Sequence, residues 1–232
     1  PIIEMGGRDL AVGLLARAGD GSWLEEALAR VAMETGDVPP EIVVVTDGAD
    51  ATLAPLVEQR LPAAKIVAAE CSESPAGMAN RAIESTTSQH ILLLQAGVLP
   101  RQGCFDAVLA AFVEYPQAGA LALPLHREGG QVESSALSMS RWGRVLPHRE
   151  TTGASQSISA VRSVAGAYRR EMLEETSGFD PVLVGELCDA DLCVRALLLG
   201  YRSMRVDGPG FDVDDGVTLL TFERDDGARE EL

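Results

Sequence analysis

The chain has 232 residues, of which 46% are hydrophobic and 23% charged, so it can bury one substantial core. This balance excludes intrinsic disorder, which needs low hydrophobicity together with high charge. Acidic residues outnumber basic ones by 35 to 19, and the net charge of −16 argues against nucleic acid or an anionic membrane surface as a partner. The best candidate for a membrane span, residues 91–100, is too short and contains Gln95 and Gly97, so we expect no transmembrane segment.

In the first half of the chain, short apolar runs alternate with amphipathic helical patterns. Ser22 and Glu25 have the spacing of a capping box, which predicts a helix that begins just after Ser22. The alternation is typical of βαβ units, so we expect an α/β fold with a Rossmann-like, mainly parallel sheet flanked by helices in a single domain. The expected strands are 9–15, 41–45, 66–69, 91–94 and 120–125, and the expected helices are 22–32, 53–61, 78–83 and 102–115.

The second half of the chain differs in composition and in hydrophobic periodicity. Residues 127–163 are polar and show no sustained period, which predicts a long loop or short hairpins over the sheet. Regular patterning resumes at 165–175, and a helix is expected at about 189–199 with Gly200 as its C-cap. A last strand is expected at 201–206, before an acidic tail.

The cysteines have none of the spacings of a zinc site. Cys71, Cys104, Cys188 and Cys193 form no C-x-x-C pair and lie at no zinc-like distance from a histidine. We therefore expect buried thiols in a reducing compartment. Because no secretory signal is visible at the start of the chain, the expected location is cytoplasmic.

Ligands of an open parallel sheet bind beyond the carboxyl ends of its strands, and three loops with polar residues are expected there. Asp47 and Asp50 follow the second strand, where carboxylates bind a nucleobase or ribose, or form an Asx turn and an N-cap. Gln95 and Gly97 end the fourth strand, where a pair of metal-holding carboxylates would lie. Asp189 begins a helix, as a cap or as a general base facing the sheet.

Taken together, these segments resemble the family 2 glycosyltransferases of the GT-A fold, including their rhamnosyltransferase-like members. Residues 43–53 are similar to the V-D-D-G-S-T-D-x-T-L turn of that family, and residues 77–83 to its G-x-x-x-N-x-G/A-I helix. Residues 91–100 are similar to its strand L-L-L-D-A-D-V-x-P. The most specific match is Cys188-Asp189-Ala190-Asp191, with Arg195 and Gly200-Tyr201-Arg202 after it, which is similar to the E-D-x-D-L-x-x-R and G-Y-R signature.

The resemblance implies inverting transfer of a sugar, as a hexosyltransferase, from a nucleotide-diphosphate sugar to a hydroxyl of a glycan or another acceptor. Residues 1–125 would form the nucleotide-binding half and 126–232 the acceptor-side half. Asp189 would be the catalytic base, and Mn²⁺ or Mg²⁺ would offset the charge of the leaving diphosphate. The nucleotide-binding positions are Asp47, Asp50, Asn80, Gln95 and Gly97, and the acceptor-side positions are Arg169, Arg170, Asp180 and Asp191. Asp191 and Arg195 are expected to organise their helix and its partners rather than to touch substrate.

The chain departs from the family pattern at its metal site. The D-x-D is Gln95-Ala96-Gly97, and Cys188 replaces the glutamate before the base. An amide is a poor ligand for Mg²⁺ or Mn²⁺, so metal binding would fall to Asp212 or Asp214. Alternatively, the diphosphate would be held by arginines such as Arg169, Arg170 or Arg202.

Two functions follow from these departures. The first is an active glycosyltransferase, and the second a catalytically degenerate GT-A domain that serves as a binding or assembly module. A generic dinucleotide-binding domain is excluded because no G-x-G-x-x-G follows the first strand.

Overall fold

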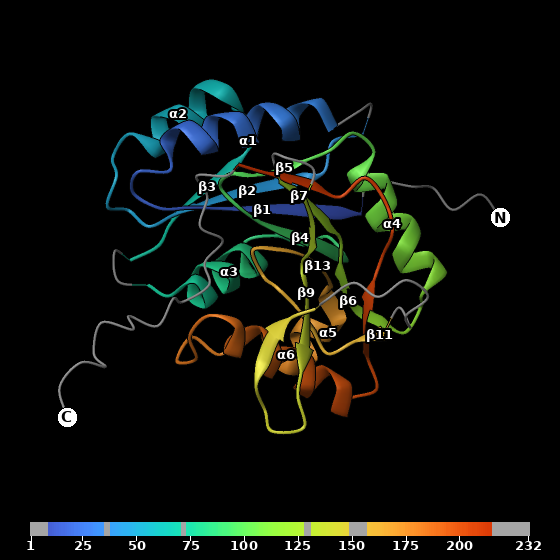
Figure 1. Ribbon diagram of the computed structural model, residues 1–232. Coiled ribbons are helices and arrows are strands. Elements are labelled where there is room, and N and C mark those ends of the chain that lie inside the picture. Colours follow the sequence, from blue (N-terminus) through green and yellow to red (C-terminus); the bar gives the residue numbers. More distant parts are fainter. Residues whose placement is uncertain (1–8, 35–37, 71–72, 128–130, 149–156, 215–232) are drawn as a thin grey trace.

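The computed structural model describes residues 9–34, 38–70, 73–127, 131–148 and 157–214, which are built around one eight-stranded sheet (Figure 1). No helix of these residues is both long and apolar enough to cross a membrane. From one outermost strand to the other, the order is β11 (Ser157–Ile158), β14 (Arg202–Arg205), β6 (Ala118–Ala122), β13 (Ala165–Arg169), β4 (His90–Gln95), β1 (Leu10–Ala16), β2 (Glu41–Thr46) and β3 (Lys65–Ala68).

The sheet is mainly parallel. The strands β4, β1, β2 and β3 pair in parallel, and so do β6 and β14. Because β13 is antiparallel to both β4 and β6, those two strands point the same way. The carboxyl ends of β1, β2, β3, β4, β6 and β14 therefore meet at one edge of the sheet, which we call the carboxyl edge. The opposite edge is called the amino edge.

Helices cover both faces of the sheet (Figure 1). Alternate residues of β1 point to opposite faces, so Leu10, Val12 and Leu14 lie on one face and Ala11 and Leu15 on the other. The first face packs against α1 (Gly21–Glu34), α2 (Leu53–Arg60) and α4 (Cys104–Glu114), and the second against α3 (Pro75–Glu84), α5 (Arg170–Thr176) and α6 (Glu186–Leu198). The α/β prediction is confirmed.

Glycine at one position of β1 allows the sheet and α3 to approach closely. A Cβ atom added to Gly13 would lie 2.9 Å from Leu93 Cδ2 and 3.0 Å from the Cβ of Ala82 in α3. The first contact is shorter than real Cβ atoms show and the second is tighter than most, so a side chain at position 13 would push α3 and its neighbours apart.

Several predicted boundaries are wrong by a few residues. The helix α1 begins at Gly21, so Ser22 lies inside its first turn and does not cap it, and Glu25 pairs with Arg60. The helix α3 begins at Pro75, earlier than predicted, because Ser74 caps it by accepting the Gly77 amide at 3.2 Å. The helix α6 begins at Glu186, three residues before Asp189.

The expected strand at 120–125 is two strands. It divides into β6 and β7 (Pro124–Arg127), and β7 belongs to a separate four-stranded sheet. Pro124 has no N–H to donate to a ladder, and it stands where the first of these strands has ended. The second sheet has the order β5 (Val98–Pro100), β15 (Phe211–Val213), β7 and β8 (Val132–Ser134), so the described part of the acidic tail contains one short strand.

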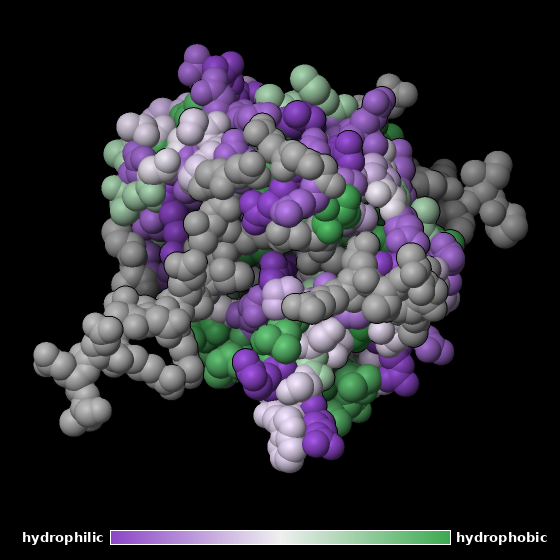
Figure 2. Space-filling view, viewed as in Figure 1, coloured by the Kyte–Doolittle hydropathy of each residue, from purple (hydrophilic) through white to green (hydrophobic). Residues whose placement is uncertain are grey.

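The polar segment 127–163 forms short hairpins where it is described, as one of the two alternatives predicted. A three-stranded antiparallel sheet contains β10 (Val145–Pro147), β9 (Ala136–Met139) and β12 (Ala160–Val161), and it contacts α6. In the space-filling view, hydrophilic side chains dominate the surface over α1 and α2, and apolar patches lie lower, around α6 and the β9–β10 hairpin (Figure 2). Exposed apolar residues of that region include Trp142, Val182, Leu187 and Leu198.

Candidate functional site

The carboxyl edge has a topological switch point beside β1. The chain order places β2 on one side of β1 and β4 on the other, and Leu15 of β1 pairs with Gln95 of β4. The Ala96 amide donates to the Leu15 carbonyl at 2.9 Å, which joins the ends of the two strands. Open α/β sheets bind their ligands in the crevice at such a point.

Asp47 and Asp50 tie two loops together at this switch point. The Asp47 carboxylate accepts the Ala18 amide at 3.0 Å from the loop after β1, and the Ala49 amide at 3.0 Å from its own loop. Asp50 accepts the Thr52 hydroxyl at 2.6 Å and the Thr52 amide at 2.9 Å, and these bonds lower the pKa of Asp50. Both carboxylates thus form the Asx-type turns that the sequence allowed, and they join the loops that follow β1 and β2.

The D-x-D position offers poor ligands for a divalent cation. Gln95 is 6% exposed, and its main-chain amide donates to the Val164 carbonyl at 2.9 Å. Gly97 has φ of +88°, where an aspartate would be strained. The described residues contain no group of three or more His, Cys, Asp or Glu side chains that could hold a metal ion. The residues present therefore do not fit the metal site that the family pattern implies.

The two carboxylates proposed as substitute ligands lie near this position but differ in their contacts. The Asp214 amide is 3.5 Å from the Gly97 carbonyl, so Asp214 flanks the D-x-D position. Asp212 is held instead by two arginines, with its oxygens 3.3 Å from Arg101 Nε and 3.8 Å from Arg30 Nη1. Both oxygens of Asp212 therefore face cations, and these ion pairs compete with the binding of a metal ion.

Asp189 is a buried carboxyl group at the same edge. It is 5% exposed, its Oδ1 accepts the Ser163 amide at 3.1 Å, and the Cys188 thiol lies 3.8 Å from the same oxygen. Burial raises the pKa of Asp189 to about 7, against the opposing effect of the bond from Ser163. Burial also raises the pKa of the Cys188 thiol, which keeps it protonated as a donor. A carboxyl with a pKa near neutrality has the property that a general base requires.

A two-residue segment joins Asp189 to the D-x-D position. Val164 binds the main-chain amide of Gln95 at the end of β4, and its neighbour Ser163 binds Asp189. The sequence places Gln95 and Asp189 far apart, and the structure brings them to opposite ends of this short link. The two residues therefore connect the end of β4 with the first turn of α6.

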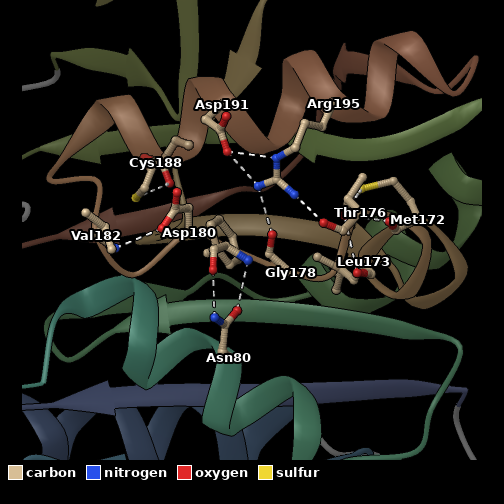
Figure 3. A network of polar contacts seen from close by, with 12 residues as sticks. Asn80, Met172, Leu173, Thr176, Gly178, Asp180, Val182, Cys188, Asp191 and Arg195 are labelled. Atoms are coloured by element: carbon tan, nitrogen blue, oxygen red, sulfur yellow. Dashed lines mark hydrogen bonds and ion pairs between the residues drawn. The ribbon is translucent and has the colours of Figure 1, made fainter.

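Asn80 and Arg195 bind the main chain between α5 and α6 (Figure 3). The Asn80 side chain donates to the Phe179 carbonyl at 2.8 Å and accepts the Phe179 amide at 2.9 Å. Arg195 binds Asp191 at 2.6 Å and donates to the Gly178 carbonyl at 2.9 Å and to the Thr176 carbonyl. The interpretation that Asp191 and Arg195 organise their helix agrees with these contacts, and Asn80 performs a similar task.

The segment between α5 and α6 borders an open pocket of about 570 Å³. Asp180, in this segment, accepts the Val182 amide at 2.9 Å. Three glutamates and one arginine line the pocket, so its charge disfavours a diphosphate. The lining residues are Glu70, Glu73, Ser74, Gly77, Asn80, Arg81, Glu84 and Pro181.

The arginines expected to hold the diphosphate lie at the amino edge, so that prediction is wrong. Arg169 pairs with His90 at the beginning of β4, and Arg202 with Ala118 at the beginning of β6. The length of β4, roughly 16 Å at about 3.3 Å per residue, separates Arg169 from Gln95. Arg169 donates to the Ala118 carbonyl at 3.0 Å, and Arg170 to the Ser88 carbonyl at 2.6 Å and the Ile83 carbonyl at 3.1 Å.

Sequence reasoning missed three residues around Asp189, which are Arg162, Ser163 and Glu186. The Arg162 guanidinium binds Glu186 at 2.7 Å, beside Asp189. The first two residues belong to the polar stretch without period, where no pattern singles out one arginine or serine. Cys104, Cys188 and Cys193 are free and buried as predicted, and Cys71 lies outside the described residues.

Comparison with known proteins identifies a family for most of the chain. A family model described as "Glycosyltransferase like family 2" matches residues 16–209. No curated protein matches the chain.

Solved structures of other proteins share the fold. The crystal structure of S. aureus TarS 1–349 is 15% identical over 88% of this chain and 60% of its own, with a TM-score of 0.64. The structure of GalNAc-T7 with UDP, GalNAc and Mn²⁺ is 13% identical over 88% of this chain and 43% of its own, with a TM-score of 0.69. The present chain thus spans about half the length of these proteins, and identities this low show the fold alone.

Proposed function

Because the chain belongs to glycosyltransferase-like family 2 and has the GT-A fold, we propose that it transfers a hexosyl group from a nucleotide-diphosphate sugar to an acceptor hydroxyl, with inversion. Asp189 is the general base of this reaction. The nucleotide-binding half is residues 1–125, and the acceptor-side half is residues 126–232. Three free, buried cysteines support a reducing, cytoplasmic setting for the protein.

The observation that carries the proposal is the Asp189 carboxyl, buried at the switch-point edge with its pKa raised to about 7. As the acceptor oxygen attacks the anomeric carbon, Asp189 takes the hydroxyl proton and the bond to the diphosphate breaks on the opposite side. The raised pKa lets the carboxylate hold that proton at neutral pH. The Ser163 amide keeps Oδ1 bound throughout, which orients the group.

The nucleotide is proposed to bind at the topological switch point, near Asp47, Asp50, Gln95 and Gly97. Asn80 belongs to α3 in the nucleotide-binding half and supports that half indirectly, through its two hydrogen bonds to Phe179. GalNAc-T7 was solved with Mn²⁺, but the residues present here do not fit a D-x-D metal site, so we assign no step to a divalent cation. The acceptor, a glycan or another hydroxyl compound, is proposed to approach from the side of Asp180 and Asp191.

The first test measures nucleotide binding and turnover separately. Calorimetry with UDP and TDP, each with Mn²⁺ and with EDTA, detects the nucleotide site. Release of nucleotide diphosphate from a panel of nucleotide sugars detects turnover. We expect Asp189→Asn to bind nucleotide like the parent and to lose turnover by about 10²–10⁴-fold, because the amide cannot accept the proton.

The matched control is Asp106→Asn, the same chemical change at an exposed position in the first turn of α4. This variant should bind nucleotide and turn over the donor as the parent does. Unchanged turnover in Asp189→Asn would remove this residue as the base, and absence of nucleotide binding under every condition would contradict the enzyme assignment.

A second candidate function is a binding or assembly module. Gln95, Gly97 and Cys188 favour it, because they replace three carboxylates of the family pattern. A module of this kind binds UDP or TDP, or neither, and leaves every nucleotide sugar of the panel intact. Turnover that depends on Asp189 would exclude it.

A further inference from the structure

Two consecutive residues bind two acidic side chains that lie one helical turn apart. Arg162 and Ser163 connect β12 to β13, and Glu186 and Asp189 belong to the first turn of α6. The Arg162 side chain binds Glu186 at 2.7 Å, and the Ser163 amide binds Asp189 at 3.1 Å. Residues three apart on a helix lie on the same face, so the two bonds form one closed contact between connection and helix, which we call the α6 clamp.

The arginine half of the α6 clamp is buried and anchored. The Arg162 side chain is 6% exposed and that of Glu186 21%, and the Arg162 amide donates to the Ser135 carbonyl at 2.8 Å. Among the described residues, Arg162 Nε is buried without a hydrogen-bond partner, and Glu186 forms the ion pair with Arg162 Nη2. Loss of the carboxylate that pairs with a buried arginine strongly destabilises the folded protein, so we expect the ion pair between Arg162 and Glu186 to persist.

We propose that Arg162 and Glu186 are positioning residues that hold the Asp189 carboxylate where it accepts the acceptor proton. The inference rests on the proposed function and names residues that act through Asp189. If the bond between Glu186 and Arg162 is lost, only the bond from the Ser163 amide to Asp189 still joins the β12–β13 connection to α6 through the α6 clamp. Asp189 then loses the orientation of its bound oxygen.

The charges around Asp189 give the two positioning residues opposite effects. The positive charge of Arg162 lowers the pKa of Asp189, and the negative charge of Glu186 raises it. The other titratable groups that face Asp189 are Tyr168, Cys188 and Cys193, whose own pKa values burial raises, so they stay neutral near pH 7. Removing the two charges one at a time therefore gives shifts of opposite sign, which a merely structural role would not produce.

The experiment compares Arg162→Gln and Glu186→Gln with the parent chain. Carbon-13 NMR of aspartate-labelled protein follows the Asp189 carboxyl, assigned by the signal missing in Asp189→Asn, and needs no substrate. We expect the pKa of Asp189 to rise by about one unit in Arg162→Gln and to fall by a similar amount in Glu186→Gln. The acid limb of turnover against pH should move in the same directions, with KM for the donor unchanged.

Three variants keep the result interpretable. Glu186→Gln retains an oxygen that accepts from Arg162, so it removes the negative charge while the hydrogen bond is kept. Arg60→Gln removes an arginine from the exposed pair with Glu25 and should leave the Asp189 titration unmoved. Arg162→Lys keeps the charge and should restore most of the parent pKa.

Equal shifts, or none, in Arg162→Gln and Glu186→Gln would overturn the positioning role. Opposite shifts in the titration, accompanied by opposite shifts in turnover, would establish it. If the parent turns over no donor, the proposed function fails, whereas the titration still decides whether the α6 clamp controls the Asp189 carboxyl.

Discussion

The two edges of the central sheet use their charged residues differently. At the amino edge, Arg169 and Arg170 donate to main-chain carbonyls of neighbouring elements. At the carboxyl edge, Asp189 is buried with one amide and one thiol near its bound oxygen, and burial raises its pKa to about 7. The arginines at the amino edge thus complete the hydrogen bonding of main-chain carbonyls. At the carboxyl edge, burial disfavours the charged form of Asp189.

This difference explains why the kind of residue alone does not identify a site. Arginine is suited to binding phosphate, but Arg170 uses its guanidinium to bind the carbonyls of Ile83 and Ser88 and the Thr86 hydroxyl, near the end of α3. Carbonyls in the last turn of a helix have no partner within it, so the arginine helps to cap α3. A group left in an unfavourable state, such as Asp189, is the better guide to function.

The largest effect on stability is expected from Asp189→Asn. The folded pKa of about 7 lies above the usual aspartate value, so the folded protein holds a proton that the unfolded chain has released between these values. The contribution of Asp189 to stability is therefore full at low pH and is lost as pH rises through 7. At pH 8 the variant should be more stable by up to about 4 kcal/mol, at about 1.4 kcal/mol for each unit of pKa difference.

Urea unfolding of Asp189→Asn and the parent from pH 4 to 8 measures this difference, which should shrink toward zero at the acid end. The Asp106→Asn variant, from an exposed position, is the matched control for the loss of one carboxylate. If the parent chain is as stable at pH 8 as Asp189→Asn, burial of the Asp189 carboxylate does not lower the free energy of unfolding, and the proposed difference between the two edges is wrong.

At the amino edge, Arg170→Ala should have the opposite sign. The change removes three hydrogen bonds, to Ser88, Ile83 and Thr86, and should lower the free energy of unfolding by about 3 kcal/mol, at about 1 kcal/mol for each bond. Urea unfolding measures the loss, and calorimetry should find unchanged UDP affinity. A weakened nucleotide site in a folded Arg170→Ala protein would place this arginine in the binding machinery after all.

The strands of the first half can be predicted from the sequence, and the position of the arginines cannot. Apolar runs bounded by turn residues indicate the regions of β1 to β4, because burial on both faces of a parallel sheet requires such runs. The direction of β13 depends on its pairing with β4 and β6, which no local pattern records. Since β13 is antiparallel, its end carries Arg169 to the amino edge.

The candidate site is predictable in part for the same reason. Asp189 is identifiable by its motif, and the turns at Asp47 and Asp50 follow from local chemistry. The partners of Asp189 are not predictable, because Ser163 is 26 residues away and lies in a segment whose polar composition fits many loops. Contacts of this kind depend on tertiary packing rather than on periodicity.

Asn80 lies between the two edges, in the middle of α3, and should give an intermediate effect. Asn80→Ala removes both bonds to Phe179, which lies between α5 and α6, and should cost about 2 kcal/mol of unfolding free energy. Asn80→Asp keeps the acceptor for the Phe179 amide and should recover part of the loss. A larger change in UDP affinity than in stability would contradict a supporting role for Asn80.

The smallest effect is expected from Arg202→Gln, and it sharpens the comparison by isolating charge from hydrogen bonding. Arg202 is exposed at the beginning of β14, and its place in the ladder rests on its main-chain amide, which donates to the Gln117 carbonyl at 2.9 Å. Because the substitution retains this amide, the free energy of unfolding should change by less than about 0.5 kcal/mol. UDP affinity should also stay the same, because the strand length separates Arg202 from the carboxyl edge. A loss of affinity that disappears at high salt would show instead that the positive charge acts across the sheet, since screening weakens such long-range attraction.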